Sequence, residues 1–447
     1  MPPPNITGQL HLGHALFLTL QDIQTRFHQI LGDETLWLPG TDHAGLATHE
    51  KIIESLKQEG CENPTSGEYM KRGWKWKDHH HSIITNQMRR MGASCDWSKE
   101  RFTLDEDYQT TTRFAFKKMW DAGLIYKEGN DWFADMTTLA RDLISDIEKG
   151  EIDINPLSSQ NELLQMLHNI KPWCLSRQIL WGMRIPLKQH NNTYVFDEGE
   201  QTQGTPETDT LDTWFLSSLW PFATLNWPSS NDNLKKFYPG NWMETGDDIL
   251  FFWCARMWMM GKFLTGSYPF KRLFLHGLIR DKHGRKMSKS LGNGISPLLL
   301  LDKIGADALR WHLAIRAEPA QDIKFSEQAC LNDSKWLNKI WQAGRFLSQF
   351  GHPHKQHPNT PYALEELTQK WMQALKNDEF PSCARLIQSS FREEFCGQWI
   401  ETHKNTLREG NTLVLEQGWE LYLHYLRLFH PFLPFLTTEL HQRLWGD

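Results

Sequence analysis

What this sequence lacks excludes several classes of protein. Lys and Arg number 48 against 54 Asp and Glu, so the formal net charge is −6 and any RNA contact must come from local basic patches. No apolar run of about 18 residues occurs, and we expect no membrane span. The seven cysteines form no CxxC pair, so neither a zinc ribbon nor a disulfide framework is expected. The start, MPPPNITGQL, has neither region of a secretory signal, and a reducing cytoplasm is the expected location.

What remains is an ordinary globular composition, 40% hydrophobic and 23% charged, in 447 residues, enough for two or three domains. The 21 tryptophans are expected mainly to fill the cores. Short apolar runs at 36–38 and 273–279 predict buried strands. Strands that alternate with helices indicate a parallel α/β sheet. Helical spacing of apolar residues predicts helices at 13–31, 43–58, 68–91, 105–123 and near 247–261.

The second half of the chain has a different pattern. The stretch 149–162 is polar, contains a proline and is expected to be a linker. From about residue 325 onward the pattern is helical only, with a loop expected at 351–361. Residues 363–445 are expected to form three or four amphipathic helices that pack as a bundle.

The motif His11-Leu12-Gly13-His14 stands at the start of the first predicted helix. The two histidines are three residues apart, on one helical face, beside free N–H groups that attract an anion. Two imidazole donors there can hold phosphate oxygens as charge grows in a transition state, and Gly13 leaves room for a flat base. Composition alone predicts roughly 0.06 such matches, so the motif is a moderate signal, and two helix-start histidines without a ligand remain the alternative.

The segment Lys286-Met287-Ser288-Lys289-Ser290 lies between two glycines, directly after the strand expected at 273–279. Its two lysines can supply point charges to the leaving end of a triphosphate. Most KxxK patterns are solvated basic loops, but ligands in parallel sheets bind beyond the carboxyl ends of strands. The position of this loop therefore favours a functional role.

Together, HLGH and KMSKS in this order are similar to the two signature motifs of the class I aminoacyl-tRNA synthetases. The wider resemblance is to the valyl-tRNA synthetase family, and it covers nearly the whole chain. It rests on PPPNITGQLHLGHAL, WLPGTDHAGLAT, DWSKERFTLDE, SRQILWGMRIP, DTLDTWFLSSLWPFATLNWP, TGDDILFFWCARMWMMG, HGLIRDKHGRKMSKSLGN, GADALRWHL and FHPFLPFLTTELHQRLW.

The resemblance implies a Rossmann-like catalytic domain with a parallel sheet, followed by an all-α anticodon-binding bundle. The implied parts are a first catalytic half (1–148), a short connection (149–172), a second catalytic half with the lysine loop (173–320) and the helical domain (321–447). The implied activity is ATP-dependent conversion of valine to valyl-adenylate and transfer to the 3′ end of tRNA(Val). A cytoplasmic monomer is the family expectation.

The resemblance also assigns residues to ATP. His11 and His14 are implied to grip the triphosphate, and Lys286 and Lys289 the leaving pyrophosphate. Mg²⁺ is implied on the phosphates. The implied ATP-binding set is His11, Gly13, His14, His276, Lys286, Ser288 and Lys289.

For the amino acid, the resemblance gives Asp42 the substrate ammonium group, although an Asp at this place is also a good helix N-cap. The implied side-chain pocket consists of Pro3, Trp214, Ile249 and Trp253, with Asp248 nearby. For each tryptophan taken alone, core packing is the simpler interpretation. Such a pocket excludes isoleucine by size but cannot strongly reject threonine, a limit for which valyl-tRNA synthetase is itself the known example.

The chain departs from the family in four places. Only about twenty residues follow Ser145–Glu148 before Pro172, too few for the family's editing domain, so hydrolysis of mischarged Thr-tRNA in cis is not expected. The cysteine pairs that bind zinc in some members are missing, so no zinc is expected. The C-terminal coiled coil is missing after Asp447. An apolar strand precedes the PPPN segment in relatives, and its loss would leave strand edges unpaired. Three explanations stay open: the real start lies upstream, another segment lies in the gap, or the domain is impaired.

Two other functions stay open. One is an amino-acid-activating paralogue whose acceptor is a carrier protein or a small amine, and the other is a non-catalytic RNA-binding relic. The helical bundle favours tRNA, and the intact phosphate motifs argue against a relic. Five basic residues are candidates for tRNA phosphates, with a solvated helix face as the alternative: Arg310, Arg316, Lys335, Lys339 and Arg345.

Overall fold

The computed structural model describes residues 1–287, 293–353 and 361–446. The chain divides into two compact units, and each is made of several segments. The first unit contains residues 1–9, 36–86 and 95–275, and the second contains residues 10–35, 87–94 and 276–447. The HLGH helix therefore packs with the C-terminal part of the chain, although it lies near the start of the sequence.

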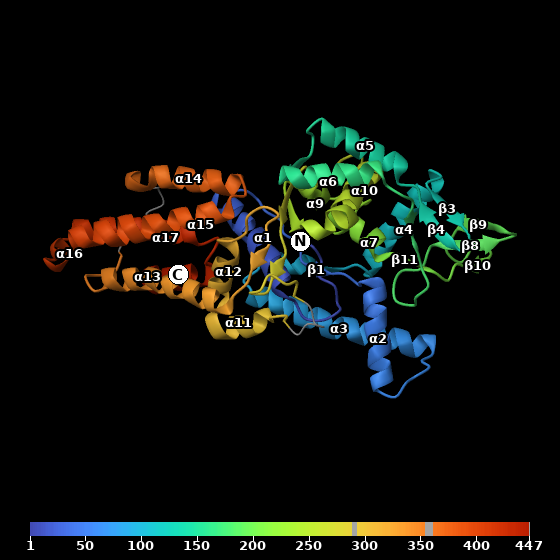
Figure 1. The fold of residues 1–447 in the computed structure, drawn as a ribbon, viewed down its shortest axis with the longest axis horizontal. Coiled ribbons are helices and arrows are strands. Elements are labelled where there is room, and N and C mark those ends of the chain that lie inside the picture. Colours follow the sequence, from blue (N-terminus) through green and yellow to red (C-terminus); the bar gives the residue numbers. More distant parts are fainter. Residues whose placement is uncertain (288–292, 354–360, 447) are drawn as a thin grey trace. The chain divides into compact units, whose positions relative to one another are not determined.

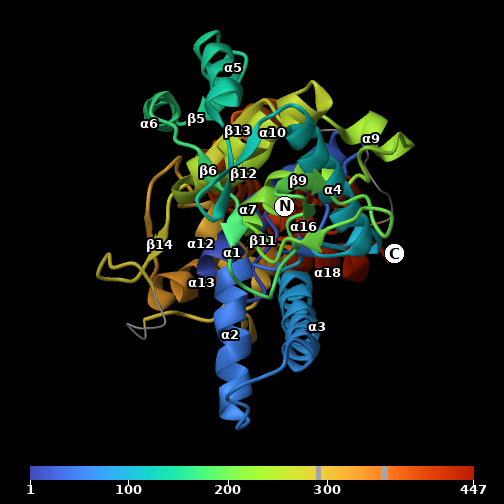
Figure 2. The same cartoon turned by 90° about the vertical axis from the view of Figure 1, so that its right-hand side faces the viewer.

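The first unit is α/β, and parallel strand pairs form its centre. Strand β13 (Arg272–His276), whose last residue already belongs to the second unit, pairs in parallel with β5 (Asp153–Asn155) in a sheet of order β12-β13-β5 (Figure 2). A second parallel pair joins β1 (Gly40–Thr41) to β2 (Arg101–Phe102), and beside it Asn5 forms a parallel bridge with Asp42. Residues 4–6 therefore pair beside β1.

Helices and short antiparallel sheets surround these pairs. Hairpin β3-β4 pairs with β6, β8 pairs with β9 and β10, and β7 pairs with β11. The helices of this unit are α2 (Gly45–Gln58), α3 (Ser66–Arg90), η1 (Trp97–Lys99), α4 (Glu106–Asp121), α5 (Thr137–Glu148), α6 (Leu157–His168), α7 (Thr213–Ser218), α8 (Trp220–Ala223), α9 (Asp232–Phe237), η2 (Asp247–Ile249), η3 (Leu250–Ala255) and α10 (Arg256–Thr265). The remaining strands are β3 (Ile125–Glu128), β4 (Asp131–Ala134), β6 (Trp173–Cys174), β7 (Ser176–Arg177), β8 (Leu187–His190), β9 (Thr193–Phe196), β10 (Thr205–Pro206), β11 (Thr210–Leu211) and β12 (Met243–Gly246).

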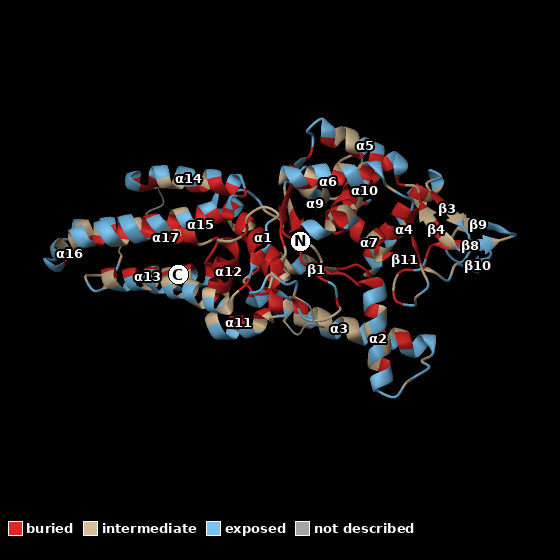
Figure 3. Cartoon of the chain, viewed as in Figure 1, coloured by how far each residue is buried: buried red, intermediate tan, exposed pale blue. Residues whose placement is uncertain are grey.

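The second unit is almost entirely helical (Figure 1). Among the residues described in this unit, β14 (Ile279–Arg280) and β15 (Ile323–Lys324) form a parallel strand pair. Helices α13 to α18 form a bundle whose facing sides are buried and whose outer sides are exposed (Figure 3). Its helices are α1 (Leu12–Ile30), α11 (Pro297–Ile304), α12 (Ala306–Ala314), α13 (Glu327–Ser348), η4 (Tyr362–Leu364), α14 (Glu365–Lys376), α15 (Phe380–Ser390), η5 (Phe391–Ile400), α16 (Glu401–Arg408), α17 (Thr412–Phe429) and α18 (Pro434–Trp445).

Helix α1 is held within the second unit by polar contacts along its C-terminal half. The amide of Gln24 donates to the carbonyl of Leu375 (2.8 Å) and to the carboxylate of Asp378 (2.7 Å). The ring of Phe27 meets the edge of Trp371, with 5.3 Å between centroids. The end of α1 opposite the histidine motif is thus built into the bundle.

Most expectations from the sequence are confirmed. The α/β fold followed by helices agrees, and α1, α2, α3 and α4 lie within two residues of their predicted bounds. The helix predicted near 247–261 is present, but it starts as a 3₁₀ turn and a π-helix, a form that is frequent at functional sites. The strand predicted at 273–279 is split after His276, because the N–H of Leu278 bonds the carboxylate of Asp322 and not a neighbouring strand.

Two expectations were wrong. Residues 36–38 form no strand, because Pro39 has no N–H to offer and the strand begins only at Gly40. The stretch 149–162 is not a linker, because Ile154 is buried in β5 and α6 begins at Leu157. The loop expected at 351–361 falls mostly outside the described residues. The predicted domain bounds, including the start of the helical domain at 321, stay predictions.

Among the described helices, none is both long and apolar enough to cross a membrane. The largest fully buried side chains are mostly aromatic, which agrees with tryptophan as a core residue. They include Trp132, Trp181, Trp253 and Trp258 in the first unit and Trp311, Trp371 and Trp419 in the second.

Candidate functional site

The two histidines of the HLGH motif cap the first turn of α1. His11 is the N-cap residue, and its Nδ1 accepts the backbone N–H of Gly13 at 3.1 Å. The Nδ1 of His14 accepts the backbone N–H of His11, also at 3.1 Å, which completes a reciprocal capping box. The two rings stand 3.8 Å apart between centroids. Helix capping therefore fixes both imidazoles at the positive end of the helix dipole.

This arrangement also fixes the tautomers. A neutral imidazole that accepts at Nδ1 carries its proton on Nε2, so each ring is a donor at Nε2. Burial, followed by the charge of His11, lowers the pKa of His14 well below its ordinary value, and His14 is therefore neutral near pH 7. Two N–H donors beside a helix N-terminus suit an anion such as a phosphate.

The structure explains why position 13 of the motif is a glycine. A Cβ at this position would lie 2.9 Å from Cε1 and 3.0 Å from Nδ1 of His11. Any side chain would therefore push the His11 ring off the helix start. The glycine serves the histidine cap, whether or not it also makes room for a base.

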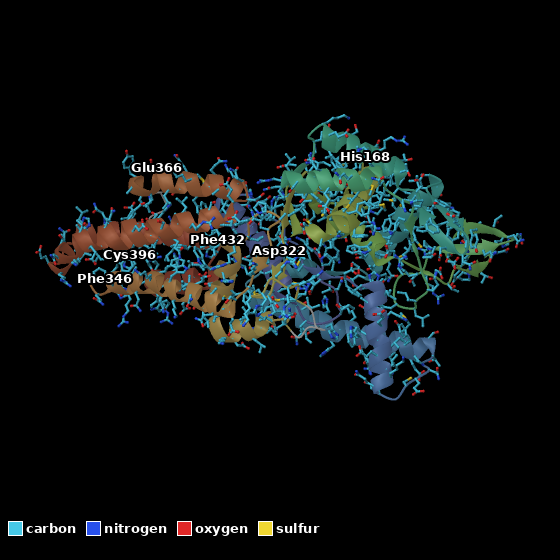
Figure 4. All side chains as sticks on the ribbon, in the orientation of Figure 1. His168, Asp322, Phe346, Glu366, Cys396 and Phe432 are labelled. Atoms are coloured by element: carbon cyan, nitrogen blue, oxygen red, sulfur yellow. The ribbon has the colours of Figure 1, made fainter. Side chains whose placement is uncertain are left out.

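The lysine segment follows β14 in the same unit. Arg280 and Lys286 form an antiparallel bridge, which brings the chain back along β14, and Lys286 is exposed. The strand itself is fixed by Asp322 (labelled in Figure 4), which accepts the N–H of Leu278 at 2.8 Å and pairs with Arg280. Ser288 and Lys289, the other predicted members of this site, lie outside the described residues.

Asp281 organises this turn, and the sequence analysis did not single it out. Its carboxylate accepts the N–H groups of His283 and Arg285, the Nε of Arg285 and the amide of Asn293, at 2.8 to 3.0 Å. These bonds, with that of Asn293 first, hold the pKa of Asp281 well below its usual range. The signal was available, because an Asp before a KHG turn is a typical turn residue.

His276, the remaining predicted ATP residue, ends β13 and is buried. Its Nδ1 bonds the carbonyl of Gly277 at 2.8 Å, so the proton is on Nδ1. His11, Gly13, His14, His276 and Lys286 thus all belong to the second unit.

Asp42, in the first unit, is a buried carboxylate with several partners. Its Oδ1 accepts the N–H of Ala44 (2.6 Å) and the hydroxyl of Thr213 (2.8 Å), and its Oδ2 accepts the hydroxyl of Ser217. The alternative role as the N-cap of α2 is not what is observed, since Ala44 occupies that position with a left-handed backbone. The bonds instead hold the carboxylate in one orientation.

The pocket residues are only partly brought together. The indole N–H of Trp253 donates to the carbonyl of Ser217 (2.9 Å), which ties this buried ring to the Asp42 cluster. Trp214 follows Thr213 in the chain and stacks on Phe252 at 6.3 Å. Pro3 precedes Pro4, whose carbonyl accepts the N–H of Asp42 (2.9 Å).

Ile249 is half-buried and Asp248 is exposed, and both lie in the 3₁₀ turn η2. Their places in the predicted pocket stay predictions.

One basic residue predicted as a possible RNA contact is excluded. Arg310 is fully buried and pairs with Asp22 at 2.7 Å. It also donates to the carbonyls of Met91 (3.3 Å), Pro431 (2.7 Å) and Phe432 (3.2 Å, labelled in Figure 4). All its donors point inward because they satisfy buried acceptors, so Arg310 is a structural residue.

The other four basic residues differ in exposure and pairing. Arg316 is partly neutralised by Asp333 at 2.6 Å. Lys335, Lys339 and Arg345 are exposed on α13 and stay candidates for an RNA surface.

With this geometry in view, the comparisons with known proteins decide the family. Residues 1–130, 126–205 and 194–326 match "tRNA synthetases class I (I, L, M and V)". The chain belongs to the class I tRNA synthetases. Residues 362–447 match the anticodon-binding domain of tRNA ligases, so the helical bundle of this synthetase carries that domain.

The curated relatives of this synthetase are similar over its whole length. Valine–tRNA ligase of Carboxydothermus hydrogenoformans is 28% identical over 99% of this chain and 75% of the relative. The chloroplastic/mitochondrial valine–tRNA ligase 2 of Arabidopsis thaliana is 30% identical over 99% of this chain and 70% of the relative. The first of these alignments runs over 660 positions, far more than the 447 residues of the chain, so part of the relative's length has no counterpart here.

Solved structures share the fold. Methionyl-tRNA synthetase of Mycobacterium tuberculosis with methionyl-adenylate has a TM-score of 0.78 and 17% identity, and it covers 100% of this chain and 94% of its own. LeuRS of Agrobacterium radiobacter K84, in a ternary complex with tRNA and LeuAMS, also has a TM-score of 0.78, with 16% identity over 100% of this chain and 84% of its own.

Across residues 1–287, 293–353 and 361–446, no group of three or more His, Cys, Asp or Glu side chains is placed to hold a metal ion. The expected lack of zinc stays a prediction.

Proposed function

We propose that this class I synthetase is a valine–tRNA ligase that forms valyl-adenylate from valine and ATP and passes valine to tRNA(Val). The observation that carries the proposal is the capping box of His11 and His14. It presents two Nε2–H donors at a helix N-terminus, in the same compact unit as the lysine segment anchored by Asp281. The similarity to valine–tRNA ligases supports the choice of amino acid.

In the first step, a carboxylate oxygen of valine attacks the α-phosphorus of ATP. A new O–P bond forms, and the bond to the bridging oxygen of the β-phosphate breaks, so that pyrophosphate leaves with the electron pair. The protein supplies position and charge and no nucleophile. His11 and His14 donate to phosphate oxygens, while Lys286 and Lys289 neutralise the leaving pyrophosphate.

The neutral state of His14 suits this role. A neutral ring whose Nδ1 is taken by the backbone donates at one fixed place and needs no proton exchange during the reaction. Gly13, Ser288 and His276 complete the proposed ATP site, with Gly13 preserving the cap.

Mg²⁺ is proposed to enter with ATP and not through a protein cage. Mg²⁺ keeps several waters and often binds through substrate phosphates. When bound, it would neutralise phosphate charge.

For the amino acid, Asp42 is proposed to pair with the ammonium group. Its carboxylate is held by two hydroxyls and one N–H, none of which neutralises its charge, so it can still attract a cation. The apolar side chain would be bounded by Pro3, Trp214, Ile249 and Trp253, with Asp248 nearby.

In the second step, the hydroxyl of the terminal ribose of tRNA attacks the acyl carbon. The bond to the phosphate oxygen of AMP breaks, and AMP leaves. The 2′-hydroxyl is the attacking group implied by the family. The anticodon-binding domain in the second unit supports tRNA as the acceptor, over a carrier protein or small amine.

We further infer a monomer that works in the cytoplasm, where tRNA and free amino acids are found. All seven cysteines are free, as is usual in a reducing compartment.

The test is ATP–pyrophosphate exchange with each of the twenty amino acids, followed by charging of tRNA(Val). Valine should give the highest kcat/KM, with threonine within roughly 100-fold of it. Exchange without charging would favour the paralogue with another acceptor, and no exchange at all would favour a non-catalytic RNA-binding protein.

The lack of cis editing is proposed from the connection itself. Between α5 and β6 the chain forms only β5 and α6, and β5 is an integral strand of the β12-β13-β5 sheet. We expect Thr-tRNA(Val) to be deacylated no faster with the enzyme than without it. Rapid deacylation would contradict the proposal.

A further inference from the structure

One buried hydrogen bond joins another helix to the backbone beside the histidine motif. The N–H of Leu10, the residue before the N-cap His11, donates to Oε1 of Gln87 at 2.9 Å. Gln87 lies in the last turn of α3 and is 1% exposed, and Leu10 is 4% exposed. Both residues belong to the second unit, as α1 does. Gln87 has no part in the steps proposed for the reaction.

The bond adds a fixed point to the tip of α1, residues 11–14. Within the tip, the N–H of His11 donates to Nδ1 of His14, and the N–H of Gly13 donates to Nδ1 of His11, each at 3.1 Å. These caps fix the two imidazoles relative to the helix, but they do not fix the tip relative to the rest of the unit. Gln87 does so, because its side chain holds the backbone one residue before the first imidazole.

Other bonds hold the later turns of α1 to the same segment, residues 87–94. The carboxylate of Asp22 accepts the N–H and the hydroxyl of Ser94 at 2.8 and 2.6 Å. Arg26 donates to the carbonyl of Gly92 at 3.0 Å. These bonds lie about three turns or more from the histidines along the helix. The glutamine bond is therefore the nearest of this set to the helix tip.

The amide nitrogen of Gln87 shows that stability alone does not favour glutamine here. Its Nε2 is buried and has no hydrogen-bond partner within the described part of the chain. An unpaired buried NH₂ group costs free energy, and an apolar side chain would avoid that cost. The apolar side chain would instead leave the buried N–H of Leu10 unpaired, which is a penalty of the same kind. What glutamine adds is the fixed place of Leu10.

Resting on the proposed function, we propose that Gln87 is a positioning residue for adenylate formation. By holding Leu10, it sets where the Nε2–H donors of His11 and His14 stand when charge develops on the phosphates. A shift of about 1 Å in such a group can cost about 100-fold in rate. Gln87 acts through the two imidazoles and contacts neither ATP nor valine.

The experiment replaces Gln87 by Met and by Glu in the full chain. Met has a similar length but no acceptor for the N–H of Leu10. Glu keeps an oxygen at the position of Oε1, and burial raises the pKa of such a carboxyl, so that it stays neutral and still accepts the bond. ATP–pyrophosphate exchange gives kcat and the KM for valine, and thermal unfolding gives the melting temperature.

Ser94→Ala is the matched control. It removes one bond between segment 87–94 and α1, but the N–H of Ser94 and the side chain of Arg26 still hold that part of the helix. Its melting temperature should fall by about 2 to 4 °C, while kcat stays within about twofold of that of the unchanged protein.

We expect the opposite pattern for Gln87→Met. Its kcat should fall about 10- to 100-fold, because the donors are displaced. Its melting temperature should stay within about 2 °C, because one unpaired group replaces another. The KM for valine should stay within about twofold, because the residues proposed to bind valine belong to the first unit. Gln87→Glu should restore kcat to within about threefold of that of the unchanged protein.

A double variant shows whether Gln87 acts through the histidines. In the His11→Asn background, Gln87→Met should lower kcat by a smaller factor than it does in the unchanged protein. The reason is that one of the two donors it positions is already absent, and residues that act through one another have effects that do not add.

Three results would overturn the inference. An unchanged kcat in Gln87→Met would show that the bond to Leu10 does not set the helix tip. Loss of kcat in both Gln87 variants together with a lower melting temperature would mark Gln87 as a packing residue. An equal loss in both backgrounds would mean that it acts independently of His11. Absence of exchange in the unchanged protein would instead refute the proposed function, so the two failures are distinguishable.

Discussion

Replacing His11 by Asn separates the two tasks of this imidazole. Nδ1 caps the helix by accepting the N–H of Gly13 at 3.1 Å, and Nε2 carries the proton proposed to reach a phosphate. Asn places an oxygen near the position of Nδ1 but nothing at that of Nε2, and it is among the best N-cap residues. His11→Asn should therefore keep the cap and lose the phosphate donor, whereas His11→Ala should lose both.

The two tasks differ in magnitude. Loss of a donor aimed at charge that develops in the transition state lowers kcat about 100- to 1,000-fold. Loss of an N-cap side chain destabilises a helix by about 1 kcal/mol, which lowers the melting temperature of a unit of this size by about 2 to 4 °C.

The assay is ATP–pyrophosphate exchange at saturating valine, beside thermal unfolding followed by tryptophan fluorescence. His11→Asn should unfold like the unchanged protein and exchange at least about 100-fold more slowly. His11→Ala should show the same kinetic loss and the lower melting temperature. If His11→Asn keeps full exchange activity, the imidazole is only a helix cap and the proposed phosphate grip is refuted.

Three further predictions follow from the second unit. The side chain of Asn in Asp281→Asn cannot accept hydrogen bonds from both Arg285 and Asn293. We therefore expect kcat for pyrophosphate exchange to fall about 10-fold or more, while the KM for valine stays constant. An unchanged kcat would show that Asp281 does not position Lys286. Arg310→Met should lower the free energy of unfolding by about 3 to 5 kcal/mol, because the buried Asp22 then keeps only Arg26 as a cation partner and the carbonyls of Pro431 and Phe432 lose their donor. Asp22→Asn together with Arg310→Met should recover part of this loss in urea titrations. If the double variant is no more stable than Arg310→Met alone, the buried ion pair does not account for the loss. The free energy of unfolding of this unit should fall as the pH drops below about 6.5, since buried and half-buried histidines with lowered pKa values take up protons only on unfolding. A free energy of unfolding that stays constant between pH 7 and 4 in urea titrations would count against this. Those histidines include His14, His424 and His430, the last two with pKa values of about 4.

The fold could be predicted where one physical signal dominates. Helices α1 to α4 carry long apolar periodicity, and their bounds were found from spacing alone. The β5 segment was missed because Asp153–Asn155 is short and polar, and only Ile154 is buried in it. Its pairing with β13, more than a hundred residues away, leaves no local signal.

The site could be predicted in part. Phosphate binding by HLGH could be predicted from the motif, but the sequence does not reveal which nitrogen of each imidazole accepts a backbone N–H. Arg310 was predicted as a possible RNA contact because it is one of five basic residues around the junction between the sheet and the helical part of the chain. Its burial depends on Asp22 and on the carbonyls of Pro431 and Phe432, which are distant in sequence. Asp281 was missed because its role lies in four hydrogen bonds and not in a motif.

The two ends of helix α1 contribute to different parts of the second unit. Its first turn carries His11 and His14, and its later turns are fastened to the bundle through Gln24 and Phe27. With 19 residues it is about 28 Å long. Tilting the fastened end by about 5° would swing the tip by about 2 Å, and a shift of that size is enough to slow a reaction that depends on alignment. The rate of ATP turnover would then depend on whether a partner is bound to the distant helical bundle.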